Sequence, residues 1–461
     1  MMKNQPRLTR REFLHTTSKA AAMLAAASAP NFIPATARGA LAPSNRVNLA
    51  MIGVGNQGFQ DMKAFLAEPD AQIVAVCDVN RGSGGYRNVS QFCGREPAKQ
   101  VVEDTYAERR RAGTFHGCDA YADFRDVLAR RDVDAVAVVV PDHWHAIITI
   151  LAARAGKDIY CEKPLSYTLA EGRAMVEAAR RSGVVVQTGS HQRSNPLTRF
   201  GCELVRNGRI GQLKRIETRI GTWNRHGPPG DWAPMPVPDG FDYDMWIGPA
   251  PWEPYHKDRC LYTFRFMRDY SGGQTTNLGA HAFDMAQWGN NTEHTGPVEI
   301  EDDGSEWPTA GLFTVAKIVK FRARYANGVE LVCTTDTEAD PDRTVAQCRF
   351  IGTEGWIEMG ASGFFAEPAS LKTSIIGANE VHLGTSTNHM RNFLDCVKTR
   401  REPAAPIEIG HRSATICHLA NIAMWLKRKL QWDPAAERFV GADAEAANHL
   451  LSRANRAPWA V

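Results

Sequence analysis

The sequence predicts an α/β protein with an N-terminal doubly wound parallel sheet and a C-terminal α/β domain built on an open, mostly antiparallel sheet. Up to residue 189, short apolar runs alternate with helical patterns, which is typical of βαβ units. Beyond residue 190, segments that alternate apolar and polar residues are joined by turn residues, which is typical of antiparallel strands. The length of 461 residues fits two or three domains.

The first element is a short apolar run at residues 47–52, followed at once by GVGNQG at 53–58 and a helical pattern at 59–66. A strand, a G-x-G-x-x-G motif and a helix in this order form the dinucleotide-binding arrangement of Rossmann domains. Free N–H groups at the helix N-terminus suit a pyrophosphate. The predicted cofactor contacts here are Gly53, Gly55, Asn56, Gln57 and Gly58.

A second apolar run, at residues 72–76, ends just before Asp78. This acid lies about twenty residues beyond the glycine motif, where a carboxylate that binds the ribose hydroxyls is expected. A carboxylate repels a 2′-phosphate, so Asp78 favours NAD. Arg81 nearby keeps NADP as the less favoured alternative.

The rest of the first domain follows the same alternation. After a polar insertion at 81–117 with one helix at 98–111, we expect strands at 134–140, 158–161 and 184–189 and helices at 146–155 and 169–182. Ligands of such sheets lie outside the carboxyl ends of the strands. The residues that follow those ends, and so are predicted to face the cofactor, are Pro141, His143, His145, Glu162 and Lys163.

The second domain begins after the last of these strands. We expect a strand at 213–222, hairpins at 317–335 and 347–359, and helices at 388–397 and 413–430. Asn327-Gly328 predicts a type I′ turn in the first hairpin. A loop at 223–254 is rich in Trp, Pro and Gly; its aromatic rings suit a sugar, a packed structural loop or a subunit contact equally well.

Polar residues of this domain are candidates for chemistry. Asn277, His281 and Asp284 would share one face of a helix. Gln192 and Arg193 are candidate substrate or cofactor contacts, with a polar interdomain hinge as the alternative. His281 and Asp284 offer two metal ligands on one helix face, but no third is evident nearby, so no metal site is predicted.

The motifs GVGNQG, PDHWHA, GKDIYCEKPL and GGQTTNLGAHAFD together resemble the glucose–fructose oxidoreductase / inositol dehydrogenase family (Gfo/Idh/MocA), from about residue 46 to the C-terminus. The resemblance implies an oxidoreductase with NAD, a sugar or polyol substrate with a secondary hydroxyl, and a homo-oligomer. It places Lys163 beside the nicotinamide, where an ammonium stabilises a developing alkoxide. His281 matches the histidine that takes the hydroxyl proton. Asn277 stands where the family has an aspartate, and that departure leaves open a nucleotide-binding protein without turnover.

Residues 1–37 resemble a twin-arginine (Tat) export signal, because Arg10-Arg11 precedes an apolar run at 20–29 and an A-x-A site at 35–37. A basic, disordered start is the alternative. The predicted organisation is therefore a signal at 1–37, a Rossmann domain at 46–190 and a C-terminal domain at 191–461, in a periplasmic or secreted protein. Because free NAD is scarce there, we expect a tightly held cofactor and a redox-neutral cycle, either between two sugars or as an NAD-dependent glycosidase.

Composition excludes other classes. The net charge of +3 favours neither nucleic acid nor a membrane surface as a partner, and no apolar stretch is long enough to span a bilayer. The ten cysteines contain no C-x-x-C pair and are expected to be mostly buried as small apolar residues. Cys93 and Cys118 lie in one region, and the sequence does not decide whether they pair.

Overall fold

The computed structural model describes residues 45–87, 91–221, 232–335, 346–360, 363–442 and 444–459. The predicted export signal and the first part of the aromatic-rich loop lie outside the described residues. Residues 47–461 form one compact unit that contains two sheets. The predicted boundary near residue 190 falls between the last strand of the first sheet and the 3₁₀ helix η3 (His191–Ser194).

The first sheet has six parallel strands, which confirms the doubly wound prediction. Their spatial order is β3 (Asp119–Tyr121), β2 (Ala71–Cys77), β1 (Val47–Ile52), β4 (Ala135–Val138), β5 (Asp158–Cys161) and β6 (Val186–Thr188). The order reverses between β1 and β4, and this reversal is where such sheets bind their ligand.

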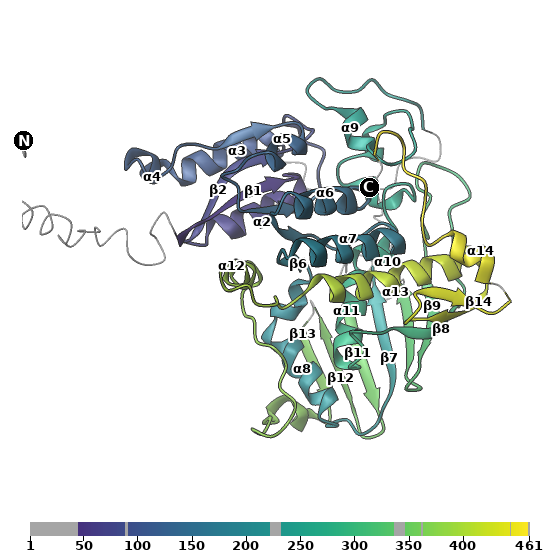
Figure 1. Cartoon of the computed structure of the whole chain (residues 1–461). Coiled ribbons are helices and arrows are strands. Elements are labelled where there is room, and N and C mark those ends of the chain that lie inside the picture. The colour runs from purple at the N-terminus through teal and green to yellow at the C-terminus, as the bar shows by residue number, and fades with distance from the viewer. Residues whose placement is uncertain are drawn as a thin grey trace, which may run out of the picture. The chain divides into compact units, whose positions relative to one another are not determined.

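Both faces of this sheet are buried. In β1, Leu49 and Met51 join a core with α2 (Asn56–Leu66), α3 (Arg95–Thr105) and α12 (His389–Thr399). Ala50 and Ile52 point the other way, into a core with α5 (Phe124–Leu128), α6 (Asp142–Arg154) and α7 (Leu169–Ser182). Figure 1 shows these helices flanking the sheet. Two-sided burial explains why the strands read as continuous apolar runs.

Two helix predictions are corrected. The helix expected at 98–111 is divided at Tyr106 into α3 and the short α4 (Ala107–Arg111). The helix expected from residue 146 begins at Asp142, so His143 and His145 belong to the first turn of α6 rather than to a loop. The prediction placed the helix start too late because its first turn is rich in polar and aromatic side chains.

The second sheet has nine strands, and only its β7–β10 pair is parallel within the described chain. Its order is β13 (Gly363–Glu367), β12 (Trp356–Gly360), β11 (Gln347–Gly352), β7 (Leu213–Ile220), β10 (Glu330–Thr335), β9 (Lys320–Tyr325), β8 (Pro297–Asp302), β14 (Lys429–Asp433) and β15 (Arg438–Val440). The predicted hairpins are confirmed as β9–β10 and β11–β12. In the first turn only Gly328 has a left-handed φ, of 85°, so the type I′ prediction, which needs two such residues, is wrong.

Helices cover one face of the second sheet. They are α8 (Pro196–Arg206), α11 (Gly279–Gly289) and α13 (Ile407–Leu426), whose apolar residues join those of the strands in one core. Shorter helices complete the described fold: α9 (Tyr243–Ile247), α10 (Gln274–Asn277) and α14 (Ala444–His449). The helix predicted at 413–430 starts earlier, at Ile407, and its last predicted residues begin β14.

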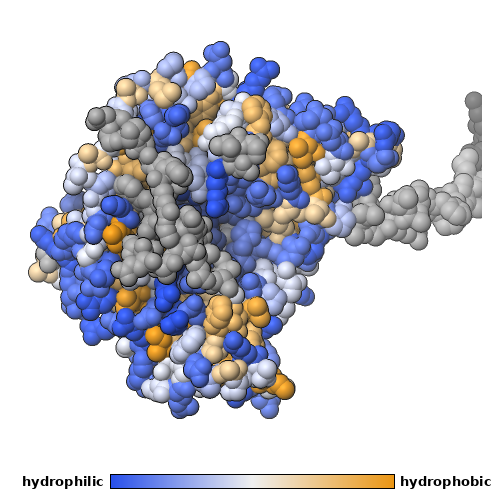
Figure 2. Space-filling view, turned by 180° about the vertical axis from the view of Figure 1, so that it is seen from behind, coloured by the Kyte–Doolittle hydropathy of each residue, from blue (hydrophilic) through white to orange (hydrophobic). Residues whose placement is uncertain are grey.

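The surface is mixed. Figure 2 shows a largely hydrophilic face on which apolar side chains are scattered in small groups. All ten cysteines are buried free thiols, so Cys93 and Cys118 are not paired. Among the described helices, none has the length and apolar character needed to cross a bilayer.

Candidate active site

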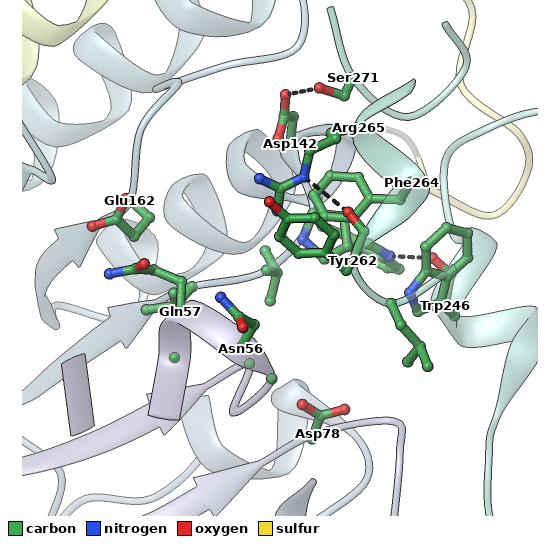
Figure 3. A pocket seen from close by; sticks show the side chains of 18 of the residues that line it. Asn56, Gln57, Asp78, Asp142, Glu162, Trp246, Tyr262, Phe264, Arg265 and Ser271 are labelled. Carbon is green, nitrogen blue, oxygen red and sulfur yellow. Dashed lines mark hydrogen bonds between the residues drawn. The ribbon is translucent and has the colours of Figure 1, made fainter. Parts of the chain in front are cut away.

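A pocket of about 560 Å³ lies at the carboxyl ends of β1, β4 and β5. Figure 3 shows its walls, which come from opposite sides of the crevice. The glycine motif and the residues after β2, β4 and β5 form one side. The other side is formed by residues between 241 and 278, including Trp246, Tyr262, Phe264 and Arg265.

Each glycine of the motif is required by a close approach. A Cβ at Gly53, whose φ is 87°, would lie 2.2 Å from the carbonyl oxygen of Val139, and one at Gly58 would lie 2.0 Å from the carbonyl oxygen of Gly53. A Cβ at Gly55 would lie 2.8 Å from the ring of Tyr86. Since α2 begins directly after Gly55, its N-terminus opens into the pocket beside Asn56 and Gln57. A phosphate group fits this cradle.

Asp78 lies at the edge of the same pocket (Figure 3). Its carboxylate accepts hydrogen bonds from the backbone N–H groups of Val54, at 2.9 Å, and Asn80, at 2.8 Å. Burial raises the pKa of Asp78, and these hydrogen bonds oppose the rise. The carboxylate is thus fixed where the sequence predicts a ribose contact.

Lys163 follows β5 and lines the pocket. Its Nζ donates hydrogen bonds to the backbone oxygen of Asn277, at 2.9 Å, and to its side-chain Oδ1, at 3.3 Å. Burial lowers the pKa of Lys163; Glu162 opposes this and Arg265 adds to it. An amine from the first sheet and an amide from the second half of the chain therefore meet in the crevice.

Arg265 is a pocket residue that the sequence did not predict. Its Nη1 donates to Asn277 Oδ1 at 3.1 Å, its Nε donates to the carbonyl oxygen of Tyr262 at 2.8 Å, and the guanidinium lies 4.0 Å from the Tyr262 ring centre. Arg265 belongs to a 3₁₀ turn, η5 (Thr263–Phe266). Such irregular segments carry no periodic pattern, which is why sequence reasoning missed it.

Behind the lysine lies a buried polar cluster. Glu162 Oε1 accepts hydrogen bonds from the hydroxyl of Tyr160, at 3.1 Å, and from Nε2 of His191, at 3.2 Å; its Oε2 accepts one from the backbone N–H of Lys163 at 3.1 Å. Asp61 joins the cluster, and its carboxylate, that of Glu162 and the His191 ring offer atoms that all lie within 4.8 Å of one another.

The two buried acids of this cluster, Asp61 and Glu162, differ in their protonation state. Burial and then the charge of Glu162 raise the pKa of Asp61 to about 8. Glu162 is also buried, but its hydrogen bond and charge interaction with His191 outweigh burial and lower its pKa to about 2. The same contacts raise the pKa of His191 above its ordinary value despite burial. Asp61 therefore holds the proton and Glu162 remains a carboxylate.

His281 lies in α11, whereas Asn277 is the last residue of α10, and the two helices are separated at Leu278. The prediction that Asn277 and His281 lie on one continuous helix is therefore wrong. It is absent from the pocket wall, but burial, and then the charge of Lys163, lower its pKa to about 3. Its Nδ1 is buried, and no described residue forms a hydrogen bond with it. The ring is therefore a neutral group that interacts electrostatically with Lys163.

Several predicted contacts lie elsewhere. Arg193, 3% exposed, is ion-paired with Asp284 and Glu293, which holds its guanidinium within the protein. Gln192 accepts a hydrogen bond from Thr198, and its role as a substrate or cofactor contact stays a prediction. Asp284 is thus held by Arg193 and by Ser413 instead of facing the pocket.

The two histidines of PDHWHA are also turned away. His143 Nε2 lies 3.0 Å from the backbone oxygen of Trp246. Both ring nitrogens of His145 lie within hydrogen-bond distance of backbone oxygens, those of Pro164 and Val140. From this segment Pro141 and Asp142 line the pocket, so the predicted cofactor contacts of His143 and His145 are not supported.

Comparison with known proteins agrees with this geometry. Residues 47–190 match the NAD-binding Rossmann fold of an oxidoreductase family, and residues 223–461 match the C-terminal alpha/beta domain of the same family. The chain belongs to the Gfo/Idh/MocA oxidoreductase family. The glycine motif, Asp78 and Lys163 therefore lie in a domain of the NAD-binding type.

Levoglucosan dehydrogenase of Pseudarthrobacter phenanthrenivorans is 28% identical over 195 residues, 42% of this chain and 42% of that protein. scyllo-Inositol 2-dehydrogenase (NAD(+)) of Bacillus subtilis is 29% identical over 188 residues, 41% of this chain and 47% of that protein. The chain thus matches less than half the length of these curated relatives. The crystal structure of aldose-aldose oxidoreductase from Caulobacter crescentus complexed with glycerol has a TM-score of 0.56 at 19% identity, covering 84% of this chain and 99% of that one, and shows the shared fold.

Proposed function

We propose that this Gfo/Idh/MocA protein is an NAD-dependent oxidoreductase that transfers hydride to or from a secondary hydroxyl of a sugar or polyol. The observation that carries the proposal is the pairing of Lys163 with Asn277 inside the pocket that the glycine motif and Asp78 also line. The names of the curated relatives, a levoglucosan dehydrogenase and a scyllo-inositol dehydrogenase, support the same substrate class.

The described residues fit the cofactor. The Gly53–Gly58 cradle would hold the pyrophosphate, Asp78 the ribose hydroxyls, and the space beside Lys163 the nicotinamide. The nicotinamide supplies the position to which hydride moves.

Lys163 binds the reacting hydroxyl and stabilises the negative charge that develops on its oxygen. Because burial lowers its pKa, the Lys163 ammonium is a stronger acid than that of a surface lysine. We assign the hydroxyl proton to the neutral ring of His281, while the Lys163 ammonium polarises the hydroxyl oxygen. Asn277 positions Lys163.

Export and assembly belong to the proposal as well. Residues 1–37 carry the twin-arginine pattern, so we propose a periplasmic or secreted protein with a tightly held cofactor. Trp246, Tyr262 and Phe264 give the pocket an aromatic wall against which a bound dinucleotide could pack. A homo-oligomer is proposed from the family resemblance.

The test is a turnover assay on the purified full-length protein with a panel of neutral sugars, inositols and uronic acids. The expected result is NADH absorbance with added NAD, or exchange of hydride between two sugars without added NAD. Release of aglycone from glycosides with no net NADH would favour the NAD-dependent glycosidase instead. A protein that binds no NAD and turns over none of these compounds would contradict the proposal.

A further inference from the structure

Two cationic side chains converge on the side chain of Asn277. Nζ of Lys163 and Nη1 of Arg265 both donate to one oxygen, Asn277 Oδ1, at 3.3 and 3.1 Å. An amide oxygen carries no formal charge, so two cations meet on a neutral atom. Like charges placed this close in a buried site repel unless an anion joins them.

The charges of Glu162 and Asp142 favour the charged form of Lys163, but the hydrogen bonds of both carboxylates are made to other groups. Asp142 Oδ2 accepts from the hydroxyl of Ser271 at 2.6 Å and from that of Thr276 at 3.4 Å. Glu162 is bonded to Tyr160, His191 and the backbone of Lys163. Within the described ranges, neither carboxylate forms an ion pair with the Lys163 ammonium or the Arg265 guanidinium.

Arg265 has donor capacity left for a ligand. Its Nε and Nη1 are used by Tyr262 and Asn277, and the flat guanidinium is held in place by the Tyr262 ring. Figure 3 shows its nitrogens pointing into the pocket. A guanidinium with a free edge matches a carboxylate in shape as well as in charge.

On the basis of the proposed function, we infer that the substrate is a sugar that carries a carboxylate, and that Arg265, with Lys163 beside it, receives that negative charge. Asn277 in place of an aspartate is then the specificity determinant, because an aspartate would neutralise the pair from within the protein. A phosphate with two charges suits the site less well, since Asp142 and Glu162 also line the pocket.

The cofactor pyrophosphate is the competing partner for Arg265. The N-terminus of α2 already offers a phosphate cradle, whereas the shared oxygen of Asn277 ties Arg265 to the Lys163 end of the pocket. If Arg265 binds the pyrophosphate, loss of its guanidinium weakens NAD binding. If it binds the substrate carboxylate, NAD affinity is unchanged.

The test is calorimetric titration of the full-length protein, with NADH present, with D-glucuronate and D-galacturonate and with their neutral methyl esters. We expect at least one acid to bind at least tenfold more tightly than its ester. Arg265→Gln should reduce that preference to threefold or less, with the Kd for NAD within twofold of wild type. Asn277→Asp, which places a carboxylate between the two cations, should reduce the preference for the acid similarly.

Arg268→Gln is the matched control, because that guanidinium stacks on Trp425 instead of contacting Asn277. This variant should retain the preference for the acid.

Equal affinity for acids and esters, binding of neither acid, or a preference that survives in both Arg265→Gln and Asn277→Asp would overturn the inference. Weakening of NAD binding by Arg265→Gln that matches the loss of acid binding would also overturn it, by assigning the guanidinium to the pyrophosphate. NADH formation is followed separately. Charge-selective binding without turnover contradicts the proposed function alone, while turnover of neutral sugars without charge selection contradicts this inference alone.

Discussion

Lys163 is the residue on which the proposed chemistry depends. Lys163→Ala removes the group that stabilises the alkoxide and leaves the phosphate cradle intact, so we expect kcat to fall by about 10²- to 10⁴-fold with little change in the Kd for NAD. Steady-state kinetics and NAD titration on the same preparation measure both. Lys398→Ala, which removes a lysine that pairs with Asp70 away from the pocket, is the control. Retention of wild-type kcat by Lys163→Ala would move the chemistry to another residue.

The raised pKa of Asp61 predicts how the stability of the fold depends on pH. Its pKa is raised to about 8 in the folded chain by burial and by Glu162, against about 4 when unfolded. Between these values the unfolded chain has released the proton that the folded chain holds, so stability falls as pH rises from about 4 to about 8 and then levels off. Asp61→Asn keeps an acceptor for Gln57 and removes the ionisable group. We expect this variant to be more stable than wild type by about 1–3 kcal/mol at pH 8, with a smaller difference at pH 5.

Urea unfolding at the two pH values measures this difference. Asp104→Asn, on the exposed side of α3, is the matched control and should leave the pH dependence unchanged. The same destabilisation of Asp61→Asn at pH 5 and pH 8 would show that Asp61 is ionised in the folded protein.

At the scale of elements, the turn between β1 and α2 should tolerate almost no added volume. A Cβ at Gly58 would lie 2.0 Å from a backbone oxygen, so Gly58→Ala must push α2 away from β1. We expect NAD affinity to fall at least tenfold and the free energy of unfolding to fall by about 1–3 kcal/mol. Gly84→Ala is the control for both quantities, because among the described residues beyond its two chain neighbours no heavy atom lies within 4 Å of the new Cβ. Unchanged NAD binding by Gly58→Ala would place the cofactor elsewhere.

The elements also show what a sequence can predict. Five strands of the first sheet were predictable because they are largely buried and read as apolar runs bounded by turn residues, whereas the short, partly exposed β3 was not predicted. The start of α6 was not, because its first turn carries Asp142, His143 and His145, which resemble a loop. Those histidines bind backbone oxygens that only the folded chain brings near.

At the scale of the whole molecule, some site residues could be predicted from local sequence patterns and others could not. Gly53, Gly58, Asp78 and Lys163 lie in the pocket because the βαβ pattern fixes their place at the strand ends. Arg265 could not be found this way, since its position follows from an irregular segment that crosses from the second half of the chain. The ion pair of Arg193 with Asp284 could not be predicted, because a separation of 91 residues leaves no local pattern.

The decisive experiment is a crystal structure of the full-length protein with NAD. We expect the pyrophosphate on the N-terminus of α2, a ribose on Asp78, and the nicotinamide ring next to Nζ of Lys163 in the pocket shared with Asn277. A nucleotide bound elsewhere, or a nicotinamide turned away from Lys163, would contradict this expectation.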